Sequence, residues 1–506
     1  MSEQQASAKT FDKNSDKNYV AIIDIGSNAV RLVVYDGLNR APFRIHNERD
    51  ICNLGADLGR TGCLNPDSVK KALGSIRRFS GLLAAMKVSH VRAVATAAVR
   101  DAKDGRDFID TVQKEFGLKI EVIDGGEEAR LSALGVLANG FGRDCVIGDF
   151  GGGSMELIVV ENGEVKHKAS LPLGSHRLQA EKGRAARMDM VEKHLNKVDF
   201  LKSCEGKDFY AMGGAWRSMA TAHMHMSHYP FRLLDHYQMD GKKAVEFASF
   251  LAKGAPAALE KTVGMSKKRL RDICVAALAM ESLFKKIKPL RLIFSGTGLR
   301  EGLVYDQLPP ALQQQDALIA GCAKIALKIS RFDDLKAFKT LSRWMSPLFA
   351  GEDAEFMRLM EASCLLSDTG WFEHEEYQAA HAFERILVMP FYGIDHPGRA
   401  FLAMTQYVRY KGFVRREGHY EDVIKPALKL LADRVIDRAA IIGLAQRMGY
   451  LLTGGALGLL RQTELELTDK KLILKLNESA DTLNADVIKD AMHALADKMR
   501  REAVIE

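Results

Sequence analysis

Two short segments place an aspartate just before a glycine turn, with apolar residues on both sides. They are Ile22-Ile23-Asp24-Ile25-Gly26-Ser27-Asn28 and Ile147-Gly148-Asp149-Phe150-Gly151-Gly152-Gly153-Ser154. Each is expected to form a strand, a D-x-G turn and a second strand, because glycine allows a tight hairpin with positive φ. Exposed backbone N–H groups in such a turn can bind phosphate, and the aspartate can bind a cation directly or through water. The chemistry indicated is phosphate binding.

The two segments form an approximate internal repeat. Asp24 corresponds to Asp149, and Gly26 corresponds to Gly151 at the same offset. A single D-x-G turn is common and is explained as readily by structure as by function. Two copies, each opening its own α/β region, instead favour two related lobes that grip one anion between them.

Two further glycine turns follow short apolar runs. Gly213-Gly214 comes after residues 209–212 and precedes a helical stretch, and residues 295–302 follow the run 292–294. A helix N-terminus at such a turn favours an anion through its N–H groups and its dipole. Each turn is a weak signal by itself, because helix caps are also rich in glycine.

A pair of glutamates, Glu127 and Glu128, follows Gly125-Gly126 at the expected start of a helix. A carboxylate there could orient and deprotonate a water molecule near the edge of a lobe. The residues alone favour a structural role, in which an acid in the first turn balances the helix dipole. Periodicity does not separate the two neighbours, so Glu127 stays a rival to Glu128.

Three carboxylates, Asp24, Asp149 and Glu156, offer hard oxygen ligands that suit Mg²⁺ or Mn²⁺. The structural alternative for Asp149 is a turn cap. For Glu156 it is a solvent-facing position on a strand, which the alternation in residues 155–160 does not exclude.

Basic residues could supply the positive charge that a phosphoanhydride substrate needs. Arg100 and Arg300 could fork onto phosphate oxygens, although pairing with a nearby carboxylate is favoured for Arg300. Two clusters could form a track for a long polyanion, but charged runs are usually solvated helix faces. They are Lys267, Lys268, Arg269 and Arg271, and Lys285, Lys286, Lys288 and Arg291.

Strands and helices alternate over the first part of the chain, which predicts an α/β fold. From about residue 311 long amphipathic stretches dominate, such as 311–329 and 379–389. Residues 463–467 and 471–476 alternate like strands, and a helix is expected over 485–501. The predicted division is a loose tail (1–18), lobe I (19–137), lobe II (138–310), an all-helical domain (311–450) and a small α+β domain (451–506).

Composition narrows the class of protein. The 506 residues are 47% apolar, and 72 Lys and Arg against 65 Asp and Glu give a formal charge of +7. This mild excess does not indicate a nucleic-acid partner. Seven cysteines without CxxC spacing indicate a reducing compartment, so the cytoplasm is expected. No membrane span is expected, because charged residues interrupt the apolar region 435–460.

Several of these motifs together resemble the exopolyphosphatase and guanosine pentaphosphate phosphohydrolase (Ppx/GppA) family, and exopolyphosphatase most closely. That family belongs to the actin-like, ribonuclease H-like ATPase superfamily. The resemblance covers roughly residues 19–310 and rests on the following motifs in order: Asp24 to Asn28, Thr96 to Arg100, Gly126 to Arg130, Asp149 to Ser154 with Glu156, and Ser295 to Gly302.

The resemblance implies two actin-like lobes with an active site in the cleft between them. It makes Glu128 the catalytic glutamate, Asp149 and Glu156 the holders of a divalent metal, and Arg100 an arginine near the phosphates. The two phosphate-binding loops would be Gly26, Ser27 and Asn28, and Gly151, Gly152, Gly153 and Ser154, with Gly213 and Gly214 added by the loop argument above. The expected reaction releases orthophosphate from the end of inorganic polyphosphate.

The helical region resembles the family's HD-like domain, whose active form needs a His-Asp pair to bind metal. Here Ser367 stands before Asp368 where the histidine would be, and the stretch at Arg409 also lacks one. This domain is therefore expected to be catalytically silent and to serve in forming a homodimer or in binding the chain. His381 is expected to pack rather than to bind metal.

Three alternative functions remain open at this stage. A guanosine pentaphosphate phosphohydrolase would use the same residues. A sugar kinase of the same superfamily would need a sugar pocket, for which no segment is evident, and would leave Glu128 idle. A non-hydrolytic, actin-like nucleotide switch would close its lobes without hydrolysing a chain.

Overall fold

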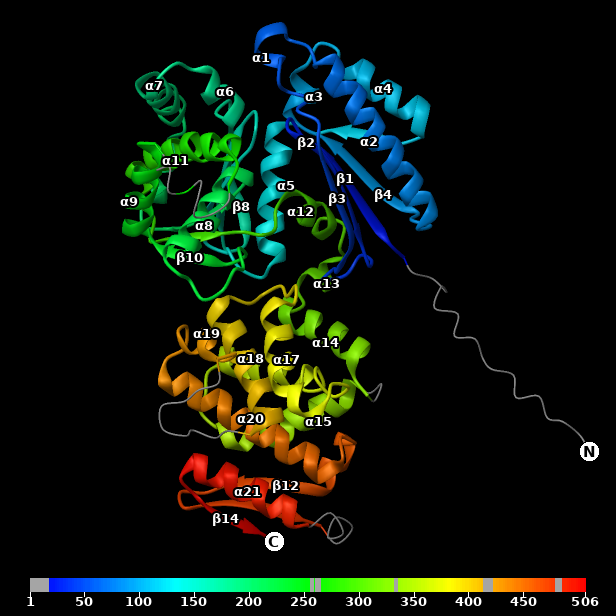
Figure 1. Ribbon diagram of the computed structural model, residues 1–506, viewed down its shortest axis with the longest axis vertical. Helices are drawn as coiled ribbons and strands as arrows, with labels where there is room; N and C mark the ends of the chain where they lie inside the picture. Colours follow the sequence, from blue (N-terminus) through cyan, green and yellow to red (C-terminus); the bar gives the residue numbers. More distant parts are fainter. Residues whose placement is uncertain (1–17, 255–258, 260–264, 332–334, 413–421, 478–484) are drawn as a thin grey trace, which may run out of the picture.

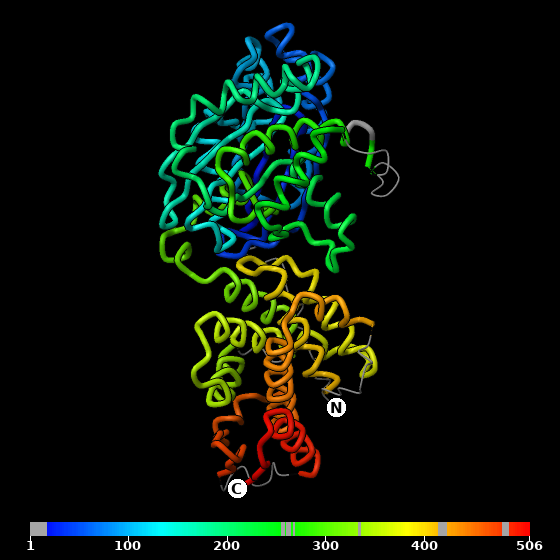
Figure 2. The backbone as a smooth tube through the Cα atoms, turned by 90° about the vertical axis from the view of Figure 1, so that its left-hand side faces the viewer, coloured from blue at the N-terminus to red at the C-terminus, as the bar shows by residue number. Residues whose placement is uncertain are grey.

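A computed structural model describes residues 18–506 except 255–258, 260–264, 332–334, 413–421 and 478–484. The molecule is elongated, with two α/β lobes at one end, a helical domain in the middle and a small sheet beside the C-terminus (Figure 1 and Figure 2). The predicted tail lies outside the described residues apart from Asn18. Within the described residues, no helix is long and apolar enough to cross a membrane.

Lobe I is built on a five-stranded sheet of order β3-β2-β1-β4-β5. Its strands are β1 (Val20–Ile25), β2 (Ala29–Tyr35), β3 (Arg44–Ile51), β4 (His90–Ala95) and β5 (Ile120–Val122). The first three are antiparallel, and β4 and β5 run parallel to β1. Helices α2 (Pro66–Ala85) and α4 (Gly105–Phe116) bury their apolar faces against one side of this sheet.

Lobe II repeats this topology in a six-stranded sheet of order β10-β11-β9-β6-β7-β8. Its strands are β6 (Cys145–Phe150), β7 (Met155–Glu161), β8 (Glu164–Leu171), β9 (Asp208–Met212), β10 (Tyr237–Asp240) and β11 (Arg291–Phe294). Strands β8-β7-β6-β9-β11 correspond one by one to β3-β2-β1-β4-β5, and β10 is an added antiparallel edge. Helices α8 (Gly214–Met226), α9 (Gly241–Ala252) and α11 (Lys267–Ile287) cover one face. The prediction of two related α/β lobes is confirmed.

Two helices, α5 (Gly125–Ala138) and α12 (Leu299–Tyr305), lie between the sheets. Leu131 of α5 packs with Leu303 of α12 on the inner face of lobe I, whereas Ala133 packs against lobe II. Glycines let the helices touch, because a Cβ on Gly302 would lie 1.8 Å from the carbonyl oxygen of Leu131. Helix α12, which fell within predicted lobe II, therefore also belongs to the core of lobe I.

The middle domain is helical, as predicted. Its main helices are α14 (Ala317–Ile329), α15 (Leu335–Met345), α16 (Ala354–Leu365), α17 (Glu375–Val388), α18 (His396–Lys411) and α20 (Asp433–Thr453). The helix expected over 311–329 is divided into α13 (Pro310–Gln313) and α14, because Asp316 caps α14 by accepting a hydrogen bond from the Ile319 N–H.

The C-terminal segment forms β12 (Thr463–Leu467), β13 (Lys471–Leu476), α21 (Asp486–Met499) and β14 (Glu502–Ile505). Both predicted strands and the helix are present, but β14, which pairs parallel to β13, was missed because four residues carry little periodicity. Its apolar residues continue the core of the helical domain. The region 451–506 is thus not a domain with a core of its own.

Short helices complete the described structure. They are α1 (Leu58–Thr61), α3 (Ala97–Asp101), α6 (Ser175–Ala180), α7 (Arg184–Leu195) and α19 (Lys425–Leu428), with 3-10 turns at Asp199–Cys204, Ser346–Phe349 and Leu457–Gln462.

A buried polar joint fixes the helical domain to the lobes. Asn139, at the C-terminal end of α5, donates to Asp235 Oδ2 (2.8 Å) and accepts from the Gly393 N–H (2.9 Å). Asp235 Oδ1 in turn accepts from the Gly296 N–H at 2.6 Å, and its carbonyl oxygen lies 3.0 Å from His396 Nε2. Residues from both lobes and from the helical domain therefore share one hydrogen-bond network.

This joint leads to the first prediction. Asn139→Ala leaves the Gly393 N–H and one oxygen of Asp235 without partners, which should lower the free energy of unfolding by about 1–3 kcal/mol. Urea unfolding followed by circular dichroism checks this against Asn47→Ala, which alters an exposed asparagine on β3. Equal midpoints for the two variants would contradict a structural role for the joint.

Candidate active site

The same backbone hydrogen bond closes the two D-x-G turns, one in each lobe. The Gly26 N–H donates to the carbonyl oxygen of Ala29 (3.0 Å), and the Gly151 N–H donates to that of Ser154 (2.9 Å). The expected positive φ is wrong at both glycines, which keep negative or extended backbone angles. The glycines serve close approach instead. A Cβ on Gly153 would lie 3.3 Å from Ser27 Oγ of the other hairpin.

The hairpins face each other across a cleft of about 460 Å³ between the lobes. Nearly all of the predicted phosphate-binding residues line it: Gly26, Ser27, Asn28, Gly151, Gly152, Gly153, Ser154, Gly213 and Gly214. Gly213 begins α8 with φ of +92°, and a Cβ there would lie 2.2 Å from the carbonyl oxygen of Phe150. Gly213 and Gly214 place the N-terminus of α8 on the wall of the cleft, where the first N–H groups of a helix have no partner within the helix.

Glu128 and Glu127 have separate environments. Both oxygens of Glu127 accept hydrogen bonds from Arg130, at 2.7 and 2.8 Å. Glu128 lines the cleft with its side chain 15% exposed, and its buried Oε2 has no hydrogen-bond partner among the described residues. Burial raises the pKa of Glu128 well above its ordinary value, and the negative charges of Glu156 and Asp149 raise it further. Of these two glutamates, Glu128 has the setting of a proton acceptor.

Asp149 and Glu156 stand opposite each other on β6 and β7. Asp149 lines the cleft and accepts from Ser132 Oγ at 3.3 Å, whereas Glu156 lies behind it and accepts from Ser170 Oγ at 2.9 Å. Burial raises the pKa of Asp149. Burial, helped by the charge of Asp149, raises the pKa of Glu156 to about 7. Two like charges are thus held together in a site with little water.

Asp24 is engaged by an arginine. Arg300 Nη1 donates to Asp24 Oδ2 at 3.0 Å, and both residues line the cleft. The pairing expected for Arg300 is therefore confirmed. It leaves Asp24 less free than Asp149 to act as the metal ligand that sequence analysis predicted.

Arg100 lies beside Glu128 rather than on the wall of the cleft. Its guanidinium donates to Asp101 Oδ1 (3.2 Å) and to the carbonyl oxygen of Ile123 (3.1 Å), and Nη1 lies 3.5 Å from Glu128 Oε2. Its geometry suits holding Glu128 in place, and the phosphate contact expected for it remains a prediction.

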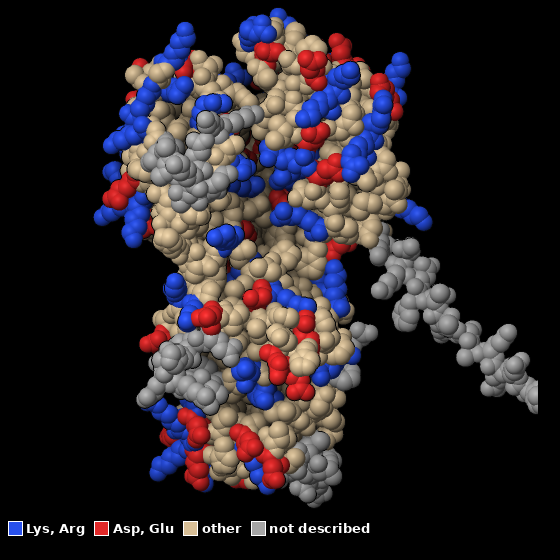
Figure 3. All heavy atoms as spheres, viewed as in Figure 1, with Lys and Arg blue, Asp and Glu red and all other residues tan. Residues whose placement is uncertain are grey.

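Sequence reasoning missed several cleft residues. Arg31 follows the first turn on β2, Arg49 lies on β3, and Arg217 of α8 donates to the carbonyl oxygens of Ser295 (3.0 Å) and Thr297 (3.2 Å). Arg269, which was considered only as part of a cluster, also lines the cleft. Figure 3 shows basic side chains on both sides of the hollow between the lobes. The one available signal was the position of Arg31 near the start of the strand that follows a glycine turn.

The basic clusters have different environments. Lys285, Lys288 and Arg291 form ion pairs with Glu281, Glu205 and Asp208, so the second cluster is a paired surface. In the first cluster, the side chains of Lys267 and Lys268 lie outside the described residues.

The carboxylates fit a divalent cation only in part. Within the described residues, no three acidic, histidine or cysteine side chains gather closely enough to hold a metal unaided. Mg²⁺, however, is commonly held by one or two carboxylates together with water and substrate phosphates. The Asp149 and Glu156 pair, with its two mutually repelling charges, meets that requirement.

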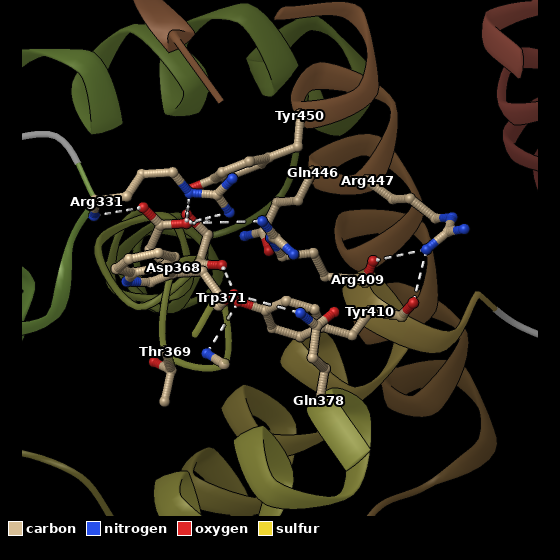
Figure 4. A network of polar contacts seen from close by, with 12 residues as sticks. Arg331, Asp368, Thr369, Trp371, Gln378, Arg409, Tyr410, Gln446, Arg447 and Tyr450 are labelled. Carbon is tan, nitrogen blue, oxygen red and sulfur yellow. Dashed lines mark hydrogen bonds and ion pairs between the residues drawn. The ribbon is translucent and has the colours of Figure 1, made fainter. Parts of the chain in front are cut away.

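The HD-like position in the helical domain holds an arginine cluster (Figure 4). Arg331 donates two hydrogen bonds to Asp368 Oδ1 (2.9 and 3.1 Å), and Arg409 Nη2 lies 3.8 Å from the same oxygen. The guanidinium of Arg409 also stacks on Tyr450, 3.7 Å from the ring centroid, whose hydroxyl lies 2.8 Å from Ser367 Oγ. Guanidinium groups thus occupy the surroundings of the Asp368 carboxylate, and the catalytic silence expected of this domain stays a prediction. His381 contacts Glu373 on the same domain.

The pKa of Glu156 leads to a second prediction. Because the folded state raises this pKa from 4.5 to about 7, the stability that its proton contributes is present below pH 4.5 and is lost as the pH rises through 7. Glu156→Gln should therefore raise the melting temperature at pH 8.5 in a chelator and change it little at pH 4, below the unfolded pKa.

The exposed Glu192→Gln serves as the control, with no pH-dependent gain expected. Saturating Mg²⁺ should reduce or reverse the gain, since only the unaltered chain keeps both ligands. A Glu156→Gln protein that is no more stable than the unaltered chain at pH 8.5 would contradict the inferred repulsion.

Comparison with known proteins places this site in context. Residues 33–311 match the Ppx/GppA phosphatase family, and residues 328–504 match the family described as exopolyphosphatase, C-terminal. The chain is 25% identical over 448 residues to Retrograde regulation protein 2 of Saccharomyces cerevisiae, covering 78% of this chain and 73% of that protein. It is 27% identical over 306 residues to Exopolyphosphatase 1 of Mycobacterium leprae, covering 57% of this chain and 89% of that protein.

Solved structures resemble the two lobes. An exopolyphosphatase from Cytophaga hutchinsonii gives a TM-score of 0.51 at 25% identity, covering 57% of this chain and 96% of its own. The Aquifex aeolicus member of the Ppx/GppA family gives 0.50 at 25% identity, covering 57% and 97%. These neighbours confirm the predicted actin-like fold. A match over more than half of the residues, on lobes of the same fold, shows that this chain belongs to the Ppx/GppA phosphatase family.

Proposed function

We propose that this chain is an exopolyphosphatase, which hydrolyses the terminal phosphoryl group of inorganic polyphosphate and releases orthophosphate. The observation that carries the proposal is Glu128, a buried carboxylate with a raised pKa that faces the cleft between two phosphate-binding hairpins. The exopolyphosphatase relatives support the choice of substrate. The free cysteines suit the reducing cytoplasm that we also propose as its location.

The reaction requires a water molecule to attack the terminal phosphorus in line with the bond that breaks. Glu128 accepts the proton from this water as its oxygen bonds to phosphorus. The P–O bond to the bridging oxygen breaks, and the shortened chain leaves with that oxygen. The ion pair with Arg100 orients the Glu128 carboxylate, and the raised pKa keeps it a stronger base than an exposed glutamate.

The backbone N–H groups of the two hairpins and of the start of α8 bind the oxygens of the terminal phosphate. Asp149 and Glu156 would hold the divalent cation, Mg²⁺ or Mn²⁺, which would supply positive charge to the phosphate oxygens. Both the cation and a homodimer through the C-terminal half stay predictions.

Guanosine pentaphosphate is a second candidate substrate. Leu234 and Met265 add an apolar patch to the wall of the cleft, next to Thr221, where a base could lie. A third possibility, a non-hydrolytic nucleotide switch, draws support from the name of the yeast relative, which refers to regulation.

Phosphate release from long-chain polyphosphate, guanosine pentaphosphate and ATP, measured in parallel with Mg²⁺ and with Mn²⁺, separates the candidates. We expect the highest kcat/KM for polyphosphate. Release from guanosine pentaphosphate alone would replace the substrate, and binding of ATP without any release would support the switch.

Glu128→Gln should lower kcat by about 10²–10⁴-fold and leave KM nearly unchanged, because the amide keeps the shape of the side chain but cannot accept the proton. Glu127→Gln is the matched control, since that carboxylate bonds to Arg130 outside the cleft. Activity of the unaltered enzyme should also fall on acidification at a pH above the ordinary range of glutamate. Full turnover by Glu128→Gln would refute this assignment.

A further inference from the structure

A row of charged side chains crosses the sheet of lobe I at the level of the first hairpin. Asp24 on β1 is the register partner of Arg31 on β2, and Arg31 is the register partner of Arg49 on β3. Directly opposite side chains on neighbouring strands share a face of the sheet, about 5 Å apart, and like charges there are unfavourable. The row runs from the hairpin outward, because β3 is an edge strand of this sheet.

The positive charges in this row are compensated only in part by a protein carboxylate, Asp24. Asp24 is already bonded to Arg300. Among the described residues, neither Arg31 nor Arg49 forms an ion pair, and the buried Nε of Arg31 has no hydrogen-bond partner. Burial, with the charges of Arg300 and Arg49, lowers the pKa of Arg31 to about 10. The fold therefore holds two neighbouring guanidinium groups at a cost in stability that the charge of Asp24 offsets only in part.

A third arginine approaches from the opposite lobe. Arg269, in the first turn of α11, lines the same cleft and has no ion pair among the described residues. After burial, the charge of Arg269 is the largest cause that lowers the pKa of Arg49. Arg49 and Arg269 therefore repel each other across the mouth of the cleft, where one arginine comes from each lobe.

We propose that Arg49 and Arg269 form a two-lobed subsite for the phosphates that follow the terminal one, so that the ligand of the cleft is an extended linear polyanion. This inference rests on the proposed function, because it specifies the substrate of the same site. Guanidinium groups bind phosphate oxygens through paired, charge-assisted hydrogen bonds, and an anion between them replaces repulsion with attraction. The hairpins bind the terminal phosphate, and the arginine row leads the chain out over β3.

The test compares the full-length Arg49→Met and Arg269→Met variants on long-chain polyphosphate and on tripolyphosphate, which is too short to pass the hairpins and fill the row. KM for the long chain should rise about tenfold for each variant, as expected for one lost charge-assisted contact, with kcat retained. KM for tripolyphosphate should stay unchanged. Arg106→Met, an exposed arginine on α4, is the control for loss of charge.

The salt dependence of KM distinguishes the subsite from a purely structural role, because a structural role would leave that dependence unchanged. The slope of log KM against log salt concentration should decrease by about 1 for each variant on long chains, because one counterion-releasing contact is lost. Melting temperatures should equal or exceed that of the unaltered chain, since each substitution removes a repulsion. Equal losses on both substrates, or an unchanged salt slope, would overturn the subsite.

A binding measurement without hydrolysis tests the subsite separately from the proposed function. Titration of long-chain polyphosphate into the Glu128→Gln protein, with and without Arg49→Met and Arg269→Met, requires no hydrolysis. A tenfold weakening supports the subsite even if the unaltered chain hydrolyses another phosphoanhydride. Equal affinity in all of these proteins overturns it even if polyphosphate is hydrolysed.

Discussion

The packing of α5 between two sheets is the constraint on which the rest of the structure depends. Its apolar residues divide between the inner faces of the two lobes, and small residues let α12 lie against it. Because the helix is held along its whole length, Glu128 at its N-terminal end has a fixed place between the hairpins. Asn139 at its C-terminal end joins the helical domain. One helix thus links the reacting group, both lobes and the C-terminal half.

The cleft holds two groups of like charges, one of carboxylates and one of arginines, which a ligand of suitable charge would stabilise. On one side the charge of Asp149 raises the pKa of Glu156, and both raise the pKa of Glu128. On the other side the charge of Arg49 lowers the pKa of Arg31, and the charge of Arg269 lowers the pKa of Arg49. Neither set neutralises the other, because among the described residues no ion pair joins a carboxylate of the first set to an arginine of the second. A cation beside the carboxylates and an anion between the arginines would offset both repulsions. The proposed ligand, a metal-bound phosphate chain, would supply both charges at once.

Features of the structure that depend on short sequence patterns could be predicted. The repeated D-x-G turns gave the paired hairpins, and the alternation of strands and helices gave the lobes. Arg49 could not be found in this way, because only the pairing of β2 with β3 brings it beside Arg31. The choice of Glu128 over Glu127 likewise depended on which of the two meets Arg130. Positive φ was predicted for the hairpin glycines, whereas their small size is what the opposing lobe requires.

The helical domain also contains a buried carboxylate, but there arginines of the same domain compensate its charge. Asp368 is buried, and the guanidinium groups of Arg331 and Arg409 surround it on a wall of aromatic rings. A permanently charged arginine cannot exchange ligands or activate water as a metal does, so the expected catalytic silence of this domain stays a prediction that these contacts favour. In the cleft, by contrast, Asp149 and Glu156 form no ion pair among the described residues. The difference between a structural charge cluster and a reactive one in this chain is therefore whether the protein itself supplies the opposite charge.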